Sequence, residues 1–131
     1  IEKTAVLYAI LANNNNLKKI VKVVHLEIRK KMNNFLKKHN KKKIIILDIP
    51  LLMENKINKK KDVLVYVDSK KSEILKRLKK RKNFNSKLLK RFKNIQLSPE
   101  YKKKKSHFII NNNFTKKSVK KGISHILKEI L

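Results

Sequence analysis

A run of four branched apolar residues, Ile44–Leu47, constrains the fold of this chain more than any other feature. Asp48 follows the run, and Pro50 comes two residues later. A continuous apolar run of this kind is typical of a strand buried on both faces in a parallel sheet. Proline has no N–H to donate to a sheet, so the strand is expected to end by Ile49. Asp48 is therefore expected near the carboxyl end of a buried strand, where open α/β sheets bind ligands.

Helices and further strands are predicted on both sides of this run. Apolar residues recur every three or four positions from Leu17 to Leu36, which indicates an amphipathic helix. A short apolar helix is expected before it, over Thr4 to Ala12, and the asparagines between the two offer a turn and a cap. Buried strands are also predicted at Val63–Val67 and Phe108–Ile110, with an irregular connection before the first of them. Further helices are predicted over residues 70–82, 87–96 and 99–105 and after Thr115, with caps at Asp68-Ser69, Asn83–Ser86, Ser98 and Thr115.

Strands that alternate with helices indicate an α/β fold with a parallel sheet, here of three strands. The chain has 131 residues, which is enough for one domain with a hydrophobic core. It begins at Ile1 rather than at a methionine, and this suggests a fragment or a processed chain.

The charge is strongly positive, with 37 basic against 9 acidic residues and a net charge of +28. Such a charge favours an anionic partner such as nucleic acid, a phosphate ligand or an acidic membrane. However, nearly all of the basic residues are lysine, and asparagine and isoleucine are also abundant. These three residue types share A/T-rich codons, so biased base composition is the simpler explanation. Polyanions are still expected to bind non-specifically.

Several kinds of site are excluded by the composition. Gly122 is the single glycine, so neither a GxxxxGK[ST] phosphate loop nor a GxGxxG loop exists in this sequence. Without cysteine there are no disulfides and no thiolate metal sites. No signal-peptide pattern and no apolar run of about 20 residues is present, so we expect a soluble cytoplasmic protein without a membrane partner.

Four segments, in this order along the chain, resemble the motifs of the dephospho-coenzyme A kinases. The most specific is Leu47–Glu54, which resembles the family signature D-I-P-L-L-F-E. His25–Arg29 resembles a His-Pro-x-ϕ-Arg motif, in which ϕ is apolar. Arg77–Gln96 resembles R-x-x-x-R-D followed by R-ϕ-x-x-Q, and Lys105–Asn112 resembles K-A-D-Y-V-I-D-N. The resemblance covers most of the chain, from about Leu17 onward.

The sequence also departs from these motifs. Leu26 stands in place of the proline, Lys82 in place of the acid, and Ser106-His107 in place of Ala-Asp. The family's phosphate loop, first strand and early catalytic aspartate are expected upstream of Ile1.

The resemblance implies a P-loop nucleoside-kinase-like fold that lacks its N-terminal strands. It implies transfer of the γ-phosphoryl group of ATP to the ribose 3′-hydroxyl of dephospho-coenzyme A, with Mg²⁺, in the last step of coenzyme A biosynthesis. The chain alone is expected to be inactive, because no residue in it can cradle the β- and γ-phosphates. The single partial domain, 1–131, is expected to comprise an acceptor-binding helical segment, core strands with a connection, a helical lid, and a last strand with its helix, at residues 1–43, 44–69, 70–105 and 106–131.

The first group of site residues implied by the resemblance would contact dephospho-coenzyme A. Its members are His25, Arg29, Asp48, Pro50, Leu51, Leu52 and Glu54. Most of them have a structural alternative: His25 as a helix-packing residue, residues 50–52 as a packed strand exit, and Glu54 as a helix cap. Asp48 is also a candidate Mg²⁺ ligand, or else it caps the following turn.

The second group would contact ATP and comprises Arg77, Arg81, Arg91, Gln96 and Asn112. Arginine is suited to bidentate phosphate contacts, and three of the four arginines fall in the lid segment. Arg77 and Arg81 are four apart, so they are expected to share a helix face and to stabilise charge on the transferred phosphoryl group. A solvated basic face is the alternative for the arginines, and a strand-ending turn is the alternative for Asn112.

Two other functions compete with this interpretation. A small basic nucleic-acid-binding protein would explain the charge, but few aromatic residues lie in basic contexts and no nucleic-acid motif is visible, so no specific nucleic acid is expected. Another P-loop nucleoside or nucleotide kinase would share the fold and would accept nucleoside monophosphates.

Overall fold

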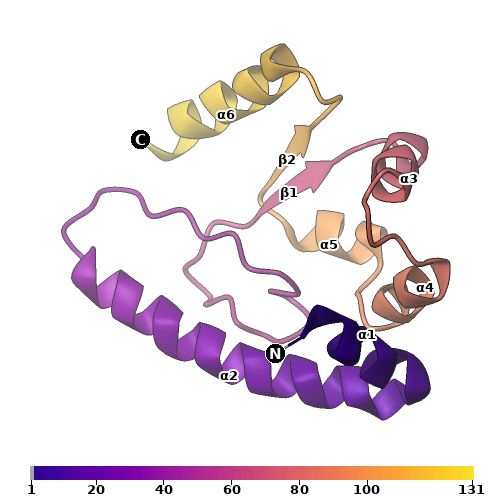
Figure 1. The fold of residues 1–131 in the computed structure, drawn as a ribbon. Helices are drawn as coiled ribbons and strands as arrows, with labels where there is room; N and C mark the ends of the chain where they lie inside the picture. The colour runs from indigo at the N-terminus through magenta and orange to yellow at the C-terminus, as the bar shows by residue number, and fades with distance from the viewer. Residues whose placement is uncertain (1) are drawn as a thin grey trace. The chain divides into compact units, whose positions relative to one another are not determined.

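The computed structural model describes residues 2–131, apart from the side chain of Asn14, and these residues contain six helices and two strands. Figure 1 shows them in chain order. The helices and strands are α1 (Lys3–Ala12), α2 (Asn14–Lys38), β1 (Val65–Asp68), α3 (Lys71–Lys79), α4 (Ser86–Asn94), α5 (Pro99–Lys105), β2 (Phe108–Asn111) and α6 (Lys116–Ile130). The class is therefore α/β, as the alternation of strands and helices predicts.

The described residues form two compact units, and the chain enters each of them twice. The first unit contains the chain up to Asn58 together with Ser86–Gln96, and so includes α1, α2 and α4. The second unit contains Lys59–Asn85 and Leu97–Leu131, and so includes both strands with α3, α5 and α6.

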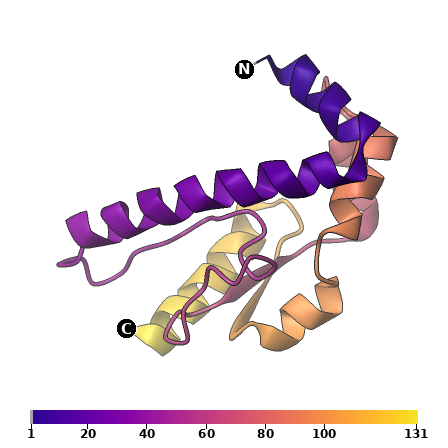
Figure 2. The ribbon, with the colours of Figure 1, turned by 90° about the horizontal axis from the view of Figure 1, so that it is seen from below.

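The amphipathic helix predicted from Leu17 is confirmed as α2, the longest helix of the first unit. It begins earlier than expected, at Asn14, because the side chain of Asn13 caps it by accepting a hydrogen bond from the Asn15 amide at 2.8 Å. The predicted cap is therefore confirmed at Asn13, and the asparagines after it form the first turn of α2. α1 packs against the start of α2, where Asn16 donates a side-chain hydrogen bond to the Ala9 carbonyl at 2.9 Å (Figure 2).

The strand predicted at Ile44–Leu47 is wrong, and the sheet has two strands rather than three. In the described part of the chain, this segment joins no sheet, and the Ile46 side chain is 86% exposed. A strand requires a neighbour that satisfies its backbone N–H and C=O groups, and an apolar run does not supply one. Buried and unpaired apolar segments share the same sequence pattern, so the pattern alone cannot separate them.

The other two strands are confirmed and form the centre of the second unit. β1 and β2 pair in parallel, with Val65 opposite Phe108 and Asp68 opposite Asn111. One face of this pair is covered by α6, which runs beside β2 in Figure 1. The single glycine lies at this contact, because a Cβ at Gly122 would come within 3.1 Å of Ile110 Cγ2.

Two of the predicted helix caps in this unit are confirmed, and one is wrong. Ser98 caps α5 by accepting from the Tyr101 amide, and Thr115 caps α6 by accepting from the Ser118 amide. The predicted cap of α3 at Asp68-Ser69 is absent: Lys70 precedes the helix without a capping hydrogen bond from its side chain. Asp68 instead ends β1, and its carboxylate accepts from Lys103 Nζ at 2.6 Å.

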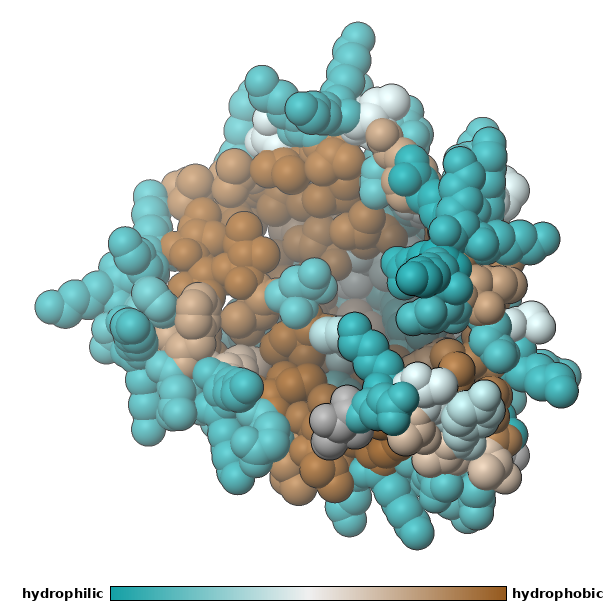
Figure 3. All heavy atoms as spheres, in the orientation of Figure 1, coloured by the Kyte–Doolittle hydropathy of each residue, from teal (hydrophilic) through white to brown (hydrophobic). Residues whose placement is uncertain are grey.

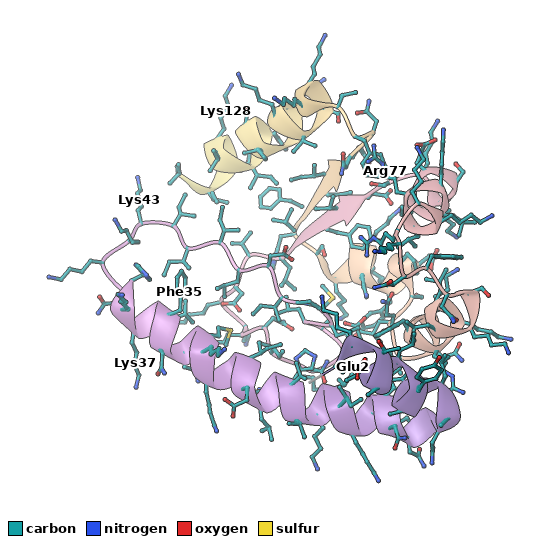
Figure 4. The ribbon with its side chains drawn as sticks, viewed as in Figure 1. Glu2, Phe35, Lys37, Lys43, Arg77 and Lys128 are labelled. Carbon is teal, nitrogen blue, oxygen red and sulfur yellow. The ribbon has the colours of Figure 1, made fainter. Side chains whose placement is uncertain are left out.

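Lysine side chains project into solvent, as Lys37, Lys43 and Lys128 do in Figure 4. Apolar side chains are nevertheless open to solvent between the hydrophilic projections on the face that Figure 3 shows. Over the described residues, no helix is both long and apolar enough to cross a bilayer.

Candidate functional site

An open pocket of about 510 Å³ lies in the first unit, beside the middle of α2. Side chains along one side of this helix line it, since residues three or four apart share a helix face. The remainder of the lining comes from a turn after Pro50 and from the end of α4. The lining residues are Lys18, Val21, Lys22, His25, Leu26, Arg29, Leu51, Glu54, Asn55, Asn94 and Ile95.

The turn after Pro50, which lines one side of the pocket, is held together by hydrogen bonds within the turn. Leu51 adopts a φ of 54°, in the left-handed region, and its carbonyl accepts from both the backbone amide and the side-chain amide of Asn55 at 3.1 and 2.9 Å. Ile57 is buried at the end of the turn and anchors it. Arg29 fastens the turn to α2 by donating from Nη2 to the Asn55 carbonyl. The guanidinium of Arg29 is therefore fixed at the pocket wall.

His25 lies deepest in this lining and is only 6% exposed. Its Nδ1 is buried and has no hydrogen-bond partner within residues 2–131. A buried polar atom without a partner is uncommon in folded proteins and marks a place where water or a ligand supplies the missing bond. The imidazole is thus held by packing and retains unused hydrogen-bonding capacity at the pocket.

The charge of the pocket is mainly positive. Lys18, Lys22 and Arg29 lie on the lining face of α2, against one carboxylate, that of Glu54. Arginine and lysine side chains arranged in this way favour an anionic ligand, and the arginine adds planar, directional donors. The apolar lining residues offer contact to an uncharged part of the same ligand. The arrangement suits a molecule that carries phosphate groups next to an apolar portion.

The structure gathers part of the predicted acceptor group in this pocket. His25, Arg29, Leu51 and Glu54 line it together, although the sequence placed them in two separate motifs. Asp48 and Pro50 are exposed and Leu52 is half-buried, and these three lie outside the lining.

The polar lining residues that the sequence did not indicate include Lys18, Lys22 and Asn55. Lys18 and Lys22 could have been found by continuing the helix face of His25 backward in steps of three and four. Asn55 follows the motif residue Glu54 directly, but no local pattern shows that its carbonyl binds Arg29.

The predicted ATP-contacting residues divide between the two units. Arg91 and Gln96 belong to the first, and Arg77, Arg81 and Asn112 to the second. Arg91 donates to the carbonyl oxygens of Ile10 and Leu11.

In the second unit, Arg77 and Asn112 both meet Phe114. Cζ of Arg77 lies 3.8 Å from the centre of the Phe114 ring, and Asn112 Oδ1 accepts from the Phe114 amide at 2.8 Å. Asn112 and Phe114 line a second pocket, of about 590 Å³, beside α6. The shared helix face predicted for Arg77 and Arg81 is wrong, because α3 ends at Lys79 and leaves Arg81 outside the helix.

The described residues offer Mg²⁺ no complete set of protein ligands. Among residues 2–131, no three His, Asp or Glu side chains lie together as a metal-binding group. Asp48 is a single exposed carboxylate, which matches how Mg²⁺ commonly takes one or two protein ligands and completes its shell with water and substrate phosphates.

Comparisons with known proteins identify the family. The family model described as dephospho-CoA kinase matches residues 1–118. The chain belongs to the dephospho-CoA kinase family. A protein from Wolbachia pipientis wMel named dephospho-CoA kinase is 30% identical over 99% of this chain and 67% of its own length. A protein of the same name from Bartonella henselae is 28% identical over 95% of this chain and 66% of its own length.

A third dephospho-CoA kinase, from Bacillus anthracis, is 34% identical over 82% of this chain and 55% of its own length. The chain thus spans between about half and two thirds of the length of these curated relatives. The family match confirms the resemblance that the four sequence motifs indicate, and it includes the α2 pocket and the segment with Arg77 and Phe114.

Proposed function

We propose that this chain is the acceptor-binding and lid portion of an ATP-dependent dephospho-coenzyme A kinase. The reaction transfers the γ-phosphoryl group of ATP to the ribose 3′-hydroxyl of dephospho-coenzyme A, with Mg²⁺ balancing the phosphate charge. The observation that carries the proposal is the α2 pocket, which combines Arg29 with a buried histidine in a chain of this family.

The chemistry of the acceptor supports its placement in this pocket. Dephospho-coenzyme A carries a diphosphate between its adenosine and its pantetheine arm. Lys18, Lys22 and Arg29 offer cations for the diphosphate, and Val21 and Leu26 offer apolar surface for the less polar parts. His25 Nδ1 would gain a hydrogen bond from the ligand or from a water that the ligand orders. Pro50 and Leu52 would then act by shaping the turn rather than by contact.

The lid residues would serve the phosphoryl group. Transfer of a phosphoryl group depends mainly on positioning and on stabilising charge, so arginines supply a large share of the catalysis. We assign this role to Arg77 and Arg81 and a supporting role at the nucleotide to Arg91, Gln96 and Asn112. Asp48 would hold Mg²⁺ directly or through water. The chain has no glycine-rich loop for the β- and γ-phosphates, so it would not turn over ATP by itself.

Titration calorimetry on the chain tests the acceptor assignment. Dephospho-coenzyme A is expected to bind, with nucleoside monophosphates binding at least about tenfold more weakly, a difference of about 1.4 kcal/mol. Arg29→Met is expected to weaken dephospho-coenzyme A binding by about tenfold or more, because a hydrogen bond to a charged group contributes about 1.5–3 kcal/mol. Lys30→Met is the matched control, since Lys30 is an exposed neighbour that pairs with Glu27 at 2.8 Å and does not line the pocket.

Three outcomes would count against the proposal. Equal binding of AMP and dephospho-coenzyme A would favour another nucleotide kinase. Equal losses from Arg29→Met and Lys30→Met would indicate attraction to the general positive charge. Robust phosphorylation of dephospho-coenzyme A by residues 1–131 alone would show that no phosphate loop is required.

A further inference from the structure

An arginine of the lid segment stacks on an aromatic ring in the second unit. Cζ of Arg77, on α3, lies 3.8 Å from the centre of the Phe114 ring, well inside the range of a cation–π interaction. Phe114 lies in the turn between β2 and α6, so the two residues come from segments that are separated in sequence. Figure 4 marks Arg77 on α3.

The backbone at Phe114 is in an unfavourable conformation for its residue type. Its φ is 65°, in the left-handed region that favours glycine and that a bulky side chain rarely adopts. The turn holds it there through neighbouring asparagines. Asn112 Oδ1 accepts from the Phe114 amide at 2.8 Å, and Asn113 Oδ1 accepts from the Thr115 amide at 3.1 Å. Strained residues that the surrounding structure over-determines concentrate at functional sites.

A cation–π contact between Arg77 and Phe114 is compatible with phosphate binding by the same arginine. A ring that packs on a face of a guanidinium leaves its five N–H donors available, because they point outward in the plane of the group. An arginine held by its face can therefore still donate two parallel hydrogen bonds to a phosphate. Stacking also restricts the rotamers of a long side chain, so less conformational entropy remains to be lost when a ligand binds.

We propose that Phe114 is a positioning residue for Arg77: it holds the guanidinium at the nucleotide side of the lid before ATP arrives. This inference rests on the proposed kinase function for the consequence in catalysis. It assigns Phe114 no contact with the reacting atoms. The ring acts through the arginine, and the turn that Asn112 and Asn113 stabilise places the ring against Arg77.

Steady-state kinetics on enzyme with its phosphate-binding loop present provide the first test, since residues 1–131 contain no such loop. Phe114→Leu is expected to lower kcat/KM for ATP by about 2- to 5-fold, the factor that an exposed cation–π contact supplies, and to leave KM for dephospho-coenzyme A unchanged. Phe114→Tyr keeps an aromatic face and is expected to restore the wild-type value. Phe84→Leu is the matched control, because Phe84 lies in the same unit and is 36% exposed, as Phe114 is.

Two further variants separate positioning from a purely structural role. Phe114→Gly suits the left-handed backbone, so it relieves strain while it removes the ring. Phe114→Gly is expected to melt at the wild-type temperature, or at least at a higher temperature than Phe114→Leu. Its loss of kcat/KM for ATP is nevertheless expected to equal that of Phe114→Leu. In an Arg77→Met background, Phe114→Leu is expected to have no further effect. Independent, additive losses in this double-mutant cycle would overturn the proposal.

A spectroscopic measurement keeps the test independent of catalysis. The Nε–Hε signal of Arg77 in a ¹⁵N NMR spectrum should show the ring-current shift of a stacked guanidinium and lose it in Phe114→Leu. An Arg77 signal that does not respond to Phe114→Leu would overturn the inference even in an active enzyme. Failure of the chain to bind dephospho-coenzyme A in titration calorimetry would overturn the proposed function, while the NMR result would still decide the role of Phe114.

Discussion

Arg91 donates a hydrogen bond from Nη1 to the carbonyl oxygen of Ile10, a residue 81 positions earlier in the chain. Nη2 of the same guanidinium donates to the Leu11 carbonyl at 2.7 Å. Both acceptors belong to the last turn of α1, where carbonyl groups have no amide partner within the helix and the helix dipole is negative. Arg91 thus fastens α4 to the end of α1 and completes the first unit.

Removing this contact should destabilise the protein. Arg91→Ala is expected to lower the free energy of unfolding by about 1.5–3 kcal/mol, the contribution of hydrogen bonds from a charged group. Arg91→Lys should recover only part of the loss, because an ammonium group cannot bridge two carbonyls as a planar fork does. Urea denaturation measures both. Arg81→Ala, at an exposed arginine, is the control and should change the free energy by less than about 0.5 kcal/mol.

His25 should show opposite effects on stability and on binding. Its buried Nδ1 lacks a partner within the described residues, so His25→Leu removes an unsatisfied polar atom. We expect the free energy of unfolding to rise by about 1 kcal/mol, at the low end of the cost of an unsatisfied buried group. We expect dephospho-coenzyme A to bind more weakly in titration calorimetry, because the ligand loses a hydrogen-bonding site. A destabilised His25→Leu protein would show that the imidazole has a partner in solution.

Gly122→Ala should destabilise the second unit although it removes a glycine from a helix. Alanine would gain about 0.8–1.0 kcal/mol in helix propensity. The new Cβ would lie 3.1 Å from Ile110 Cγ2, and Ile110 is 8% exposed and held in the paired strand β2. Overpacking of this kind costs about 1–3 kcal/mol, so a net loss of about 1 kcal/mol is expected by chemical denaturation.

The overpacking explanation has its own check. Combining Gly122→Ala with Ile110→Ala removes both atoms that the new Cβ would meet most closely, so the double variant should be more stable than the sum of the two single effects. Ser124→Ala, on the same helix, should be neutral or slightly stabilising. A stabilised Gly122→Ala protein would indicate that β2 and α6 can separate at no cost.

The ion pair between Lys103 and Asp68 should make stability sensitive to alkaline pH. The hydrogen bond that Lys103 donates to the Asp68 carboxylate raises the pKa of Lys103 above its ordinary value of 10.5. The folded state therefore holds this proton more tightly than the unfolded chain does. Its contribution is fully present below pH 10.5 and is lost as the pH rises through the folded pKa.

Unfolding in urea at pH 8 and at pH 11 measures this effect by comparison between variants. The stability difference between the wild type and Lys103→Met should shrink at the higher pH. Lys104→Met, at an exposed neighbour, should show no such change, and titration of the other lysines and tyrosines cancels in the comparison. A difference that stays constant from pH 8 to pH 11 would mean that the pair does not form.

Local patterns were sufficient to predict most helices and the two paired strands. The periodicity from Leu17 predicts α2, and Ser98 before Pro99 predicts the start of α5, because capping and periodicity depend on residues within a few positions of each other. The error at Ile44–Leu47 has the opposite origin. Whether an extended segment belongs to a sheet depends on a distant partner, which the segment itself does not encode.

The candidate sites show the same division between local and long-range information. His25 and Arg29 are found from a motif within one helix, and they do line one pocket. The contacts of Arg91 with α1 and of Arg77 with Phe114 join residues far apart in sequence, so no local pattern predicts them. Phe114 carries no signal at all, since its importance arises from a backbone angle and from the position of another helix.

The interleaving of the two units along the chain has a consequence for synthesis on the ribosome. Residues 59–85 of the second unit are made before α4, which the first unit still needs. In the second unit, β2 is made after β1. The first unit therefore stays open until Gln96 has emerged, and β1 waits for Phe108 and the residues after it before a ladder can form. Neither unit corresponds to a single contiguous fragment, so cutting the chain at any one point between Lys59 and Gln96 would leave both unfinished. Nascent chains of intermediate length would expose strand β1 with its apolar side chains, and these are the species for which chaperone binding during translation should be strongest.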